Sequence, residues 1–526
     1  MPAASRAPER AIRWRTDFDK SVIVANFEVR GWVHATNDVD WNFYWASTGS
    51  ASHWFNPESG QRLADDQVIN HFPNHSELTR KDLMVKNLKR YRKDVEKEYA
   101  SLCLSGEVEL SNAGEDDDDD PLEELDFVPA TYSLPADYSL FVEEFRRNPA
   151  STWIMKPSRG AQGTGIFLIN KLSQIKKWAN GGRWQGNTAA SKESYIVSRY
   201  IDNPLLVCGK KFDLRLYVLV TSYRPLRAYI HKHGFARFCT VEYSNDDLDN
   251  AYVHLTNVAI QKHGDDYNGN HGGKWSMGNL MLFLESTRGK EEAAKLGRKI
   301  DAVLIHSLRS CQNSIINDRH CFELYGYDVL IDDNLKPWLV EVNASPSLST
   351  TTPTDRMMKH AVLNDAFRII ESDKPFLGGA LDTGGASCQP VDEAKLGGFT
   401  VLYDEAQEVD LDRAEAAAAA EREERLHGGG AGGGTAGHIG SVYAAVAQAV
   451  HGSHKKSSGG KSSAGKKERP GSAARSANGS GGGGRPSSAR PRTAGGSNST
   501  GSRLRAAVAA EQTTTARKLK PKPSTR

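Results

Sequence analysis

The sequence has few cysteines and lacks any long apolar run. Its six cysteines, at positions 103, 208, 239, 311, 321 and 388, show neither CxxC nor CxxH spacing, which argues against a structural zinc site and against a disulfide framework. No apolar run reaches the roughly 20 residues of a membrane span. The first residues, MPAASRAPERAIRW, lack the apolar stretch of a signal peptide. We therefore expect a soluble intracellular protein with reduced thiols.

The end of the chain has little apolar content. The whole sequence of 526 residues is 38% hydrophobic and 25% charged, which allows more than one domain. From His427 onward, however, it consists mostly of Gly, Ser, Ala, Arg and Lys, and only SVYAAVAQAV offers apolar surface. Such a segment cannot offset the entropy cost of ordering. We predict a disordered tail at 427–526, preceded by a linker and charged helix at 376–426.

Charge is distributed unevenly along the chain. Residues 451–526 carry 17 Lys and Arg against 2 Asp and Glu, a net charge of +15, and the overall charge of +2 leaves −13 for the rest. A basic tail suits an acidic polymer, either nucleic acid or an acidic protein surface. A solvated extension without a partner fits the composition equally well.

The first part of the chain alternates short apolar runs with polar breaks over residues 12–46, which predicts a small α/β domain at 1–148. Within it, GEDDDDDPLEEL at 114–125 is typical of a solvated loop, because consecutive like charges repel and rarely converge on one cation.

A Gly-rich stretch follows a strand-like segment in STWIMKPSRGAQGTGIFLI, residues 151–169. It is not a P-loop, because no GKS or GKT follows and the loop opens into β-branched and aromatic residues. A hairpin with Lys156 at its entrance suits a lid over a triphosphate. An ordinary Gly-rich hairpin is the alternative.

The segment GKKFDLRLYVLV, residues 209–220, has the period of a strand. One face would carry the apolar residues, and the other would carry Lys211, Asp213, Arg215 and Tyr217. The apolar content around Arg215 favours a central strand, and therefore a polar site on that face.

A hairpin is predicted for YGYDVLIDDNLKPWLVEVN, residues 325–343. With a loop of two or four residues, Asp328 lies directly opposite Glu341, and Asn343 lies on the same face. Two facing carboxylates repel unless a cation lies between them, and with the amide oxygen they suit Mg²⁺. A buried polar pair with a structural role is the alternative.

Several motifs occur together and in order: TWIMKP, AQGTGIF, SRYI, GKKFDLRLYVLV, HLTN and LVEVNASPSL. In this combination the chain resembles the tubulin tyrosine ligase-like family, and within it the polyglutamylase branch, in particular the type of catalytic subunit that works in a multi-subunit polyglutamylase complex. The resemblance runs from about Trp14 to about Ile370 and includes WNFYW and HFPNHSELTRKDLMVKN. It implies an α/β (α+β) fold of the ATP-grasp type, with the central and C-terminal ATP-grasp domains at 149–375.

The resemblance also implies ligand roles. The residues implied to bind ATP are Lys156, Gln162, Gly163, Ser198, Arg199, Tyr200, Ile201, Lys211, Asp213, Thr256 and Asn257. Those implied to bind Mg²⁺ are Asp328, Glu341 and Asn343, and those implied to bind glutamate are Arg237, Lys274 and Asn343. Lys156, Lys211 and Glu341 are the implied catalytic residues, and Gln162 is implied to contact the acceptor peptide. Thr164 departs from the pattern, because many relatives carry Lys or Arg there.

The implied activity is ATP- and Mg²⁺-dependent ligation of L-glutamate onto glutamate side chains of tubulin C-terminal tails, through an acyl-phosphate. The resemblance implies microtubules and accessory subunits as partners, no nucleic acid or membrane, and a cytoskeletal setting in cilia or flagella, including the axoneme and basal body. One alternative is another amino-acid ligase of the same fold that adds glycine or tyrosine or uses a small-molecule acid. A second is a non-catalytic microtubule or basal-body scaffold.

Overall fold

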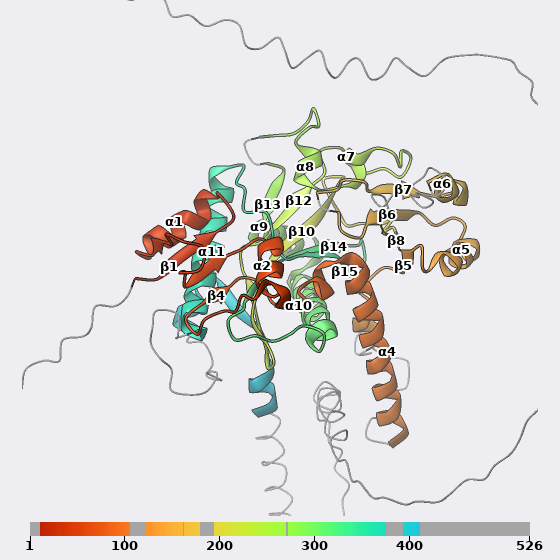
Figure 1. The fold of residues 1–526 in the computed structure, drawn as a ribbon. Helices are drawn as coiled ribbons and strands as arrows, with labels where there is room; N and C mark the ends of the chain where they lie inside the picture. Colours follow the sequence, from red (N-terminus) through yellow and green to blue (C-terminus); the bar gives the residue numbers. More distant parts are fainter. Residues whose placement is uncertain are drawn as a thin grey trace, which may run out of the picture. The chain divides into compact units, whose positions relative to one another are not determined.

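The computed structural model describes residues 11–105, 122–160, 162–178, 194–269, 272–374 and 393–410. In these ranges the chain forms three β-sheets with helices packed around them (Figure 1). The predicted tail at 427–526, the charged segment at 411–426 and the acidic run up to residue 121 lie outside the described residues. In the described part of the chain, no helix is both long and apolar enough to span a membrane.

The first sheet is small and parallel. It contains β1 (Arg13–Thr16), β2 (Val33–His34), β3 (Phe43–Trp45) and β4 (Val68–Ile69) in the order β2-β1-β3-β4. The helices of this region are α1 (Ser21–Val29), α2 (Thr48–Trp54), α3 (Ser76–Thr79) and α4 (Lys81–Ser105). α1 packs beside α11 (Pro353–Asp373) (Figure 1). There Phe27 stacks on Phe367 with ring centroids 5.4 Å apart. The N-terminal region therefore shares a core with a helix from far along the chain.

The second sheet is antiparallel and has the order β5-β8-β6-β7. Its strands are β5 (Thr131–Leu134), β6 (Trp153–Pro157), β7 (Phe167–Ile169) and β8 (Tyr195–Arg199), with α5 (Tyr138–Arg147) and α6 (Leu172–Trp178) beside them. Phe141 of α5 meets Trp153 edge-on, with ring centroids 5.2 Å apart. Because β5 and α5 precede residue 148, this sheet extends across the domain boundary that we expected there.

The third sheet is built around β10 (Lys210–Tyr223), which confirms the predicted central strand. β10 pairs with β9 (Leu206–Val207), β11 (Leu226–His231), β12 (Phe235–Phe238) and β14 (Glu323–Ile331). The sheet continues through β13 (Lys274–Ser276), β15 (Pro337–Asn343) and β16 (Phe399–Asp404). Short helices α7 (Ala251–His254), α8 (Val258–Gln261) and α12 (Glu393–Leu396) lie in the connections.

The two faces of β10 are covered by different helices. Leu214 and Leu216 belong to the core that includes residues of α9 (Met277–Arg288) and α10 (Lys290–Gln312), among them Leu304. Leu219, on the opposite face, belongs to the core that includes Val362 of α11. Full burial of each such side chain contributes about 1.5–3 kcal/mol. The alternation along the strand therefore places the predicted polar residues on the same face as Leu219.

The β14–β15 hairpin has the predicted register but not the predicted loop. Asp328 pairs with Glu341, and Gly326 pairs with Asn343. The loop contains the residues 332–336, an odd length that would displace this register. A β-bulge corrects it, because Val329 pairs with Leu339 and Val340 becomes the extra residue. The pairing of the two carboxylates was thus predicted correctly from an incorrect loop length.

Candidate functional site

A cleft lies between the second and third sheets, and most of the predicted nucleotide residues line it. With its open mouth it encloses about 1060 Å³. Its lining includes these predicted residues: Lys156, Gly163, Ser198, Arg199, Tyr200, Ile201, Lys211, Asp213, Thr256, Asn257, Asp328 and Glu341. Segments from four parts of the sequence therefore meet at one cavity.

The Gly-rich loop closes one side of the cleft through close backbone contact. Gly163 has a positive φ of 80°, and a Cβ there would lie 2.5 Å from Cδ1 of Ile260 and 3.0 Å from Oδ1 of Asn257. Only glycine suits both conditions. Thr164, where the sequence departs from the family pattern, also lines the cleft. Gln162 has a φ of 60° and lies outside the set of described residues that line it.

Two lysines line the cleft: Lys156 is half-buried and Lys211 is buried. Burial lowers the pKa of Lys156 to about 8, although Glu341 raises it. Burial likewise lowers the pKa of Lys211 to about 8. Nζ of Lys211 donates to the hydroxyl of Tyr200 at 2.9 Å and lies 4.4 Å from the centroid of its ring. An anionic ligand would stabilise the protonated form of both lysines.

Asp328 and Asp213 are paired with buried arginines. Nε of Arg215 donates to Oδ1 of Asp328 at 2.6 Å, and Arg237 contacts Oδ2 of Asp328 at 2.8 Å. Arg237 also donates to both oxygens of Asp213. Burial raises the pKa of Asp328, but Arg215 and Arg237 outweigh this effect and hold it well below its ordinary value. Both charge signs predicted on this face of β10 are therefore present, and Asp213 and Arg215 are paired with opposite charges on the neighbouring strands β12 and β14.

Lys81 is a site residue that sequence reasoning missed. Its Nζ lies 2.7 Å from Oε2 of Glu341 and donates to the carbonyl oxygen of Gly160 at 3.1 Å. It also lines the cleft, with a side chain only 8% exposed. Its place in the stretch LTRKD, which belongs to the family resemblance, was the available signal.

These pairings change the argument for a metal ion. Asp328 and Glu341 face each other as predicted, but each already has a cationic side chain as a partner. Repulsion between them therefore does not by itself require a metal. The donor set still fits Mg²⁺: a carboxylate offers about four acceptor positions, and the amide nitrogen of Asn343 donates to Gly326, which leaves the Asn343 oxygen as an acceptor.

The residues predicted to bind glutamate lie beside the cleft. Arg237 of β12 is directly opposite Lys274 of β13, so both side chains are on one face of the sheet. Arg237 reaches the cleft through Asp213 and Asp328. Nζ of Lys274 lies 3.1 Å from a carboxylate oxygen of Asp355. None of the three predicted residues, Arg237, Lys274 and Asn343, belongs to the described lining of the nucleotide cavity.

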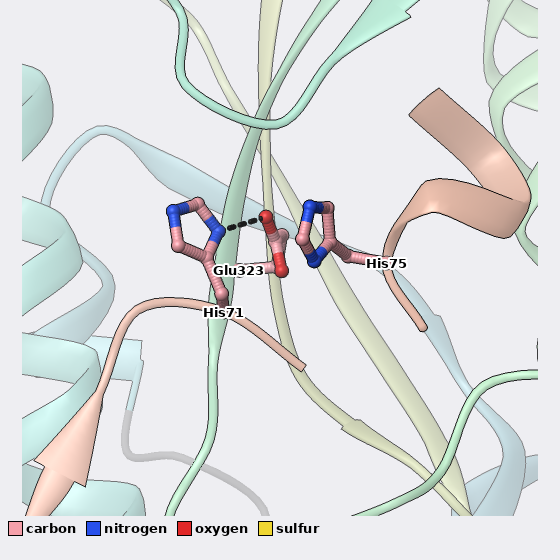
Figure 2. A group of neighbouring side chains, drawn as sticks. All are labelled: His71, His75 and Glu323. Carbon is pink, nitrogen blue, oxygen red and sulfur yellow. Dashed lines mark hydrogen bonds and ion pairs between the residues drawn. The ribbon is translucent and has the colours of Figure 1, made fainter. Parts of the chain in front are cut away.

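A second group of possible metal ligands lies outside the cleft. Figure 2 shows Glu323 between His71 and His75. Nδ1 of His71 lies 2.7 Å from Oε1 of Glu323, while the other oxygen accepts from the backbone N–H of Phe72 at 3.0 Å. Nδ1 of His75 lies 3.2 Å from the carbonyl oxygen of Phe72. Because these bonds tie Glu323 of β14 to residues 71 and 72, we interpret the group as an anchor between residues 71–75 and β14.

Comparison with known proteins identifies the same family that the sequence motifs indicated. The sequence model of the tubulin-tyrosine ligase family matches residues 59–375. The chain is 50% identical over 404 residues to the Tetrahymena thermophila protein named probable alpha-tubulin polyglutamylase Ttll1, which covers 76% of this chain and 94% of that protein. It is 42% identical over 382 residues to the Caenorhabditis elegans probable tubulin polyglutamylase ttll-9, covering 72% and 82%. It is 38% identical over 434 residues to the Rattus norvegicus probable tubulin polyglutamylase TTLL9, covering 76% and 87%.

Proposed function

Because the chain belongs to the tubulin-tyrosine ligase family, and the relatives described above are ligase-type enzymes, we propose that it is a tubulin polyglutamylase. It uses ATP and Mg²⁺ to join free L-glutamate to glutamate side chains in the acidic C-terminal tails of tubulin. The observation that carries this proposal is the paired position of Arg237 and Lys274 beside the nucleotide cleft, in a chain half identical to a relative that is named a polyglutamylase.

The reaction proceeds in two steps. An oxygen of the acceptor γ-carboxylate bonds to the γ-phosphorus of ATP as the bond to ADP breaks, which gives an acyl-phosphate. The neutral amine of glutamate then attacks the acyl carbon, and phosphate leaves as the amide forms and a proton is lost. Bound Mg²⁺ would neutralise charge on the transferring phosphoryl group, held by Asp328, Glu341 and Asn343.

The side chains of the cleft supply the remaining requirements. Lys156 and Lys211 place ammonium groups at the anionic nucleotide. Lys81 ties the Gly-rich loop to Glu341, so the loop is held over the reacting groups. A closed loop keeps water from the acyl-phosphate, which would otherwise be hydrolysed. Contact of the acceptor peptide with Gln162 remains a proposal that rests on the resemblance.

Arg237 and Lys274 distinguish glutamate from other amino acids. Glutamate carries a second carboxylate, which needs a cationic partner that glycine does not need. Two cations on one face of neighbouring strands match that requirement. The alternatives are a ligase of another amino acid and a non-catalytic scaffold. The scaffold is disfavoured because Lys156, Asp328 and Glu341 all have the residue types that the chemistry requires.

The amino-acid specificity tests this proposal. The full chain, purified with any native partners, would be given Mg-ATP, microtubules and labelled glutamate, glycine or tyrosine in parallel. We expect label from glutamate and little from the other two. Preferential incorporation of glycine or tyrosine would indicate another ligase of the fold. No incorporation of any of the three would favour the scaffold.

The basic tail supports a further part of the proposal. Residues 451–526 have a net charge of +15, and the acceptor implied by the resemblance, a tubulin tail, is acidic, so the segment from residue 427 onward is proposed to hold the enzyme on microtubules. Such attraction weakens with salt. Deletion of 427–526 should reduce microtubule pelleting at low salt, and unchanged pelleting would contradict this role. Accessory subunits and a setting in cilia or flagella remain proposals from the resemblance.

A further inference from the structure

Asp355 lies in the first turn of α11 and contacts two lysines. Its Oδ2 accepts from Nζ of Lys274 at 3.1 Å and from Nζ of Lys359 at 3.2 Å, and it also accepts from the backbone N–H of Thr351 at 3.1 Å. Asp355 is only 5% exposed. A carboxylate in the first turn of a helix often stabilises the N-terminus of that helix. Here Thr352 caps the helix, since its Oγ1 accepts from the N–H of Asp355.

Lys274 is held by a second contact as well. Its Nζ lies 4.9 Å from the centroid of the Phe235 ring, and its side chain is 12% exposed. A free lysine has about 2 kcal/mol of rotamer entropy, so a single orientation requires contacts of this kind. Asp355 and Phe235 together keep the ammonium on the face of the sheet that carries Arg237.

Lys359 connects Asp355 to the segment that follows the predicted metal ligands in the sequence. Its Nζ donates to the carbonyl oxygen of Ser349 at 2.5 Å and contacts Asp355 from one helical turn away. Ser349 belongs to the segment that leads from Asn343 at the end of β15 to the start of α11. The carboxylate of Asp355 therefore joins three parts of the fold: β13, α11 and the segment after β15.

An unpaired hydroxyl group lies near the same charges. Oη of Tyr217 is buried and has no hydrogen-bond partner among the described residues. Burial raises the pKa of Tyr217 to about 12, and the charges of Arg215 and Asp355 also act on it. Buried polar atoms without partners are rare. The Tyr217 hydroxyl is thus available to hydrogen-bond to a ligand or a water molecule near Asp355.

We propose that Asp355 is a positioning residue for the incoming amino acid: with Lys359 it holds Lys274 beside Arg237, and so sets the preference for a dicarboxylic amino acid. This inference rests on the proposed function. Asp355 neutralises one of the two lysine charges, which leaves one net positive charge for a carboxylate of the substrate. Glycine has only its α-carboxylate and gains less from an oriented second cation.

The test is a comparison of Michaelis constants in the full chain with its native partners. Asp355→Asn keeps the size of the side chain but removes its charge, and should raise KM for glutamate about tenfold or more, with KM for ATP unchanged within about twofold. Asp355→Glu keeps the negative charge, so its KM for glutamate should lie between that of the parent and that of Asp355→Asn. Lys359→Met, a second variant, should raise KM for glutamate to a smaller extent.

The matched control is Asp365→Asn. Asp365 lies on the same helix, is half-buried, and accepts from the backbone N–H of Gly398 at 2.8 Å. The Asp365→Asn variant should have a lower melting temperature but an unchanged ratio of KM for glutamate to KM for ATP. An active parent whose KM for glutamate is unmoved by Asp355→Asn and Lys359→Met, or whose two KM values rise together, would overturn the inference alone. A parent that incorporates no glutamate would overturn the proposed function and this inference with it.

Discussion

Lys81 and Glu341 form an ion pair of 2.7 Å in the lining of the cleft, although one begins α4 and the other lies near the end of β15. The same lysine donates to Gly160 in the Gly-rich loop. One side chain of the N-terminal region thus connects the predicted metal ligand to the loop that would cover the phosphates. This connection makes the N-terminal helix part of the site.

Lys81→Met should therefore reduce activity by about tenfold or more, because Glu341 loses its cationic partner and the loop loses a contact. The measurement is glutamate incorporation at saturating ATP. Lys86→Met is the matched control, since Lys86 lies on the same helix and is exposed. Equal activity of the two variants would contradict a role for Lys81 in the site.

Gly163→Ala should weaken ATP binding. The substitution places a Cβ at a φ of 80° and against Asn257, at a cost of about 1–3 kcal/mol, or roughly 5- to 150-fold in Kd. Gly60→Ala is the control, because Gly60 has a φ of 67° but no atom within 4 Å of the added Cβ. Equal ATP affinity in both variants would show that the loop does not approach the nucleotide.

ATP affinity should fall as the pH rises above about 8. Lys156 and Lys211 each have a pKa lowered by burial to about 8, so each ammonium is present below that pH and is lost above it. The dissociation constant should rise by up to about tenfold per pH unit for one titrating lysine. Titration calorimetry between pH 7 and pH 9.5 measures this, and Lys156→Arg, which stays charged, should make the curve less steep, because only Lys211 then titrates. A flat curve for the parent would contradict the assignment.

The group formed by His71, His75 and Glu323 should stabilise the protein without a metal ion. Glu323→Ala leaves Nδ1 of His71 and the N–H of Phe72 without their hydrogen-bond partner, which should cost on the order of 3 kcal/mol in the free energy of unfolding. Denaturant unfolding measures the change. In the parent, a chelator should leave the unfolding midpoint unchanged, and a large decrease would instead identify a bound metal.

Much of the site followed from local patterns in the sequence. The period of residues 209–220 identified β10 and its polar face, and the hairpin pairing placed Asp328 opposite Glu341. These features depend on side-chain alternation, which is visible within a short segment. The compensating bulge at Val340 depends on packing around the hairpin and was missed.

Contacts between distant segments could not be predicted in this way. Lys81 reaches Glu341, and Asp355 reaches Lys274, only after sheets and helices have packed. The arginines that neutralise Asp328 were visible as charges, but Arg215 was assigned only to a polar face and Arg237 only to glutamate. Ion pairs across strands depend on strand order, which a single sequence does not reveal.

The central claim is ATP-dependent glutamate ligation at this cleft. The most direct measurement is incorporation of labelled glutamate into microtubules by the full chain with its native partners, compared with Glu341→Gln. Glu285→Gln on the exposed face of α9 serves as the control. We predict incorporation by the parent and the control, and a loss on the order of 100-fold or more in Glu341→Gln with an unchanged melting profile. Equal incorporation by Glu341→Gln and the parent would contradict the account.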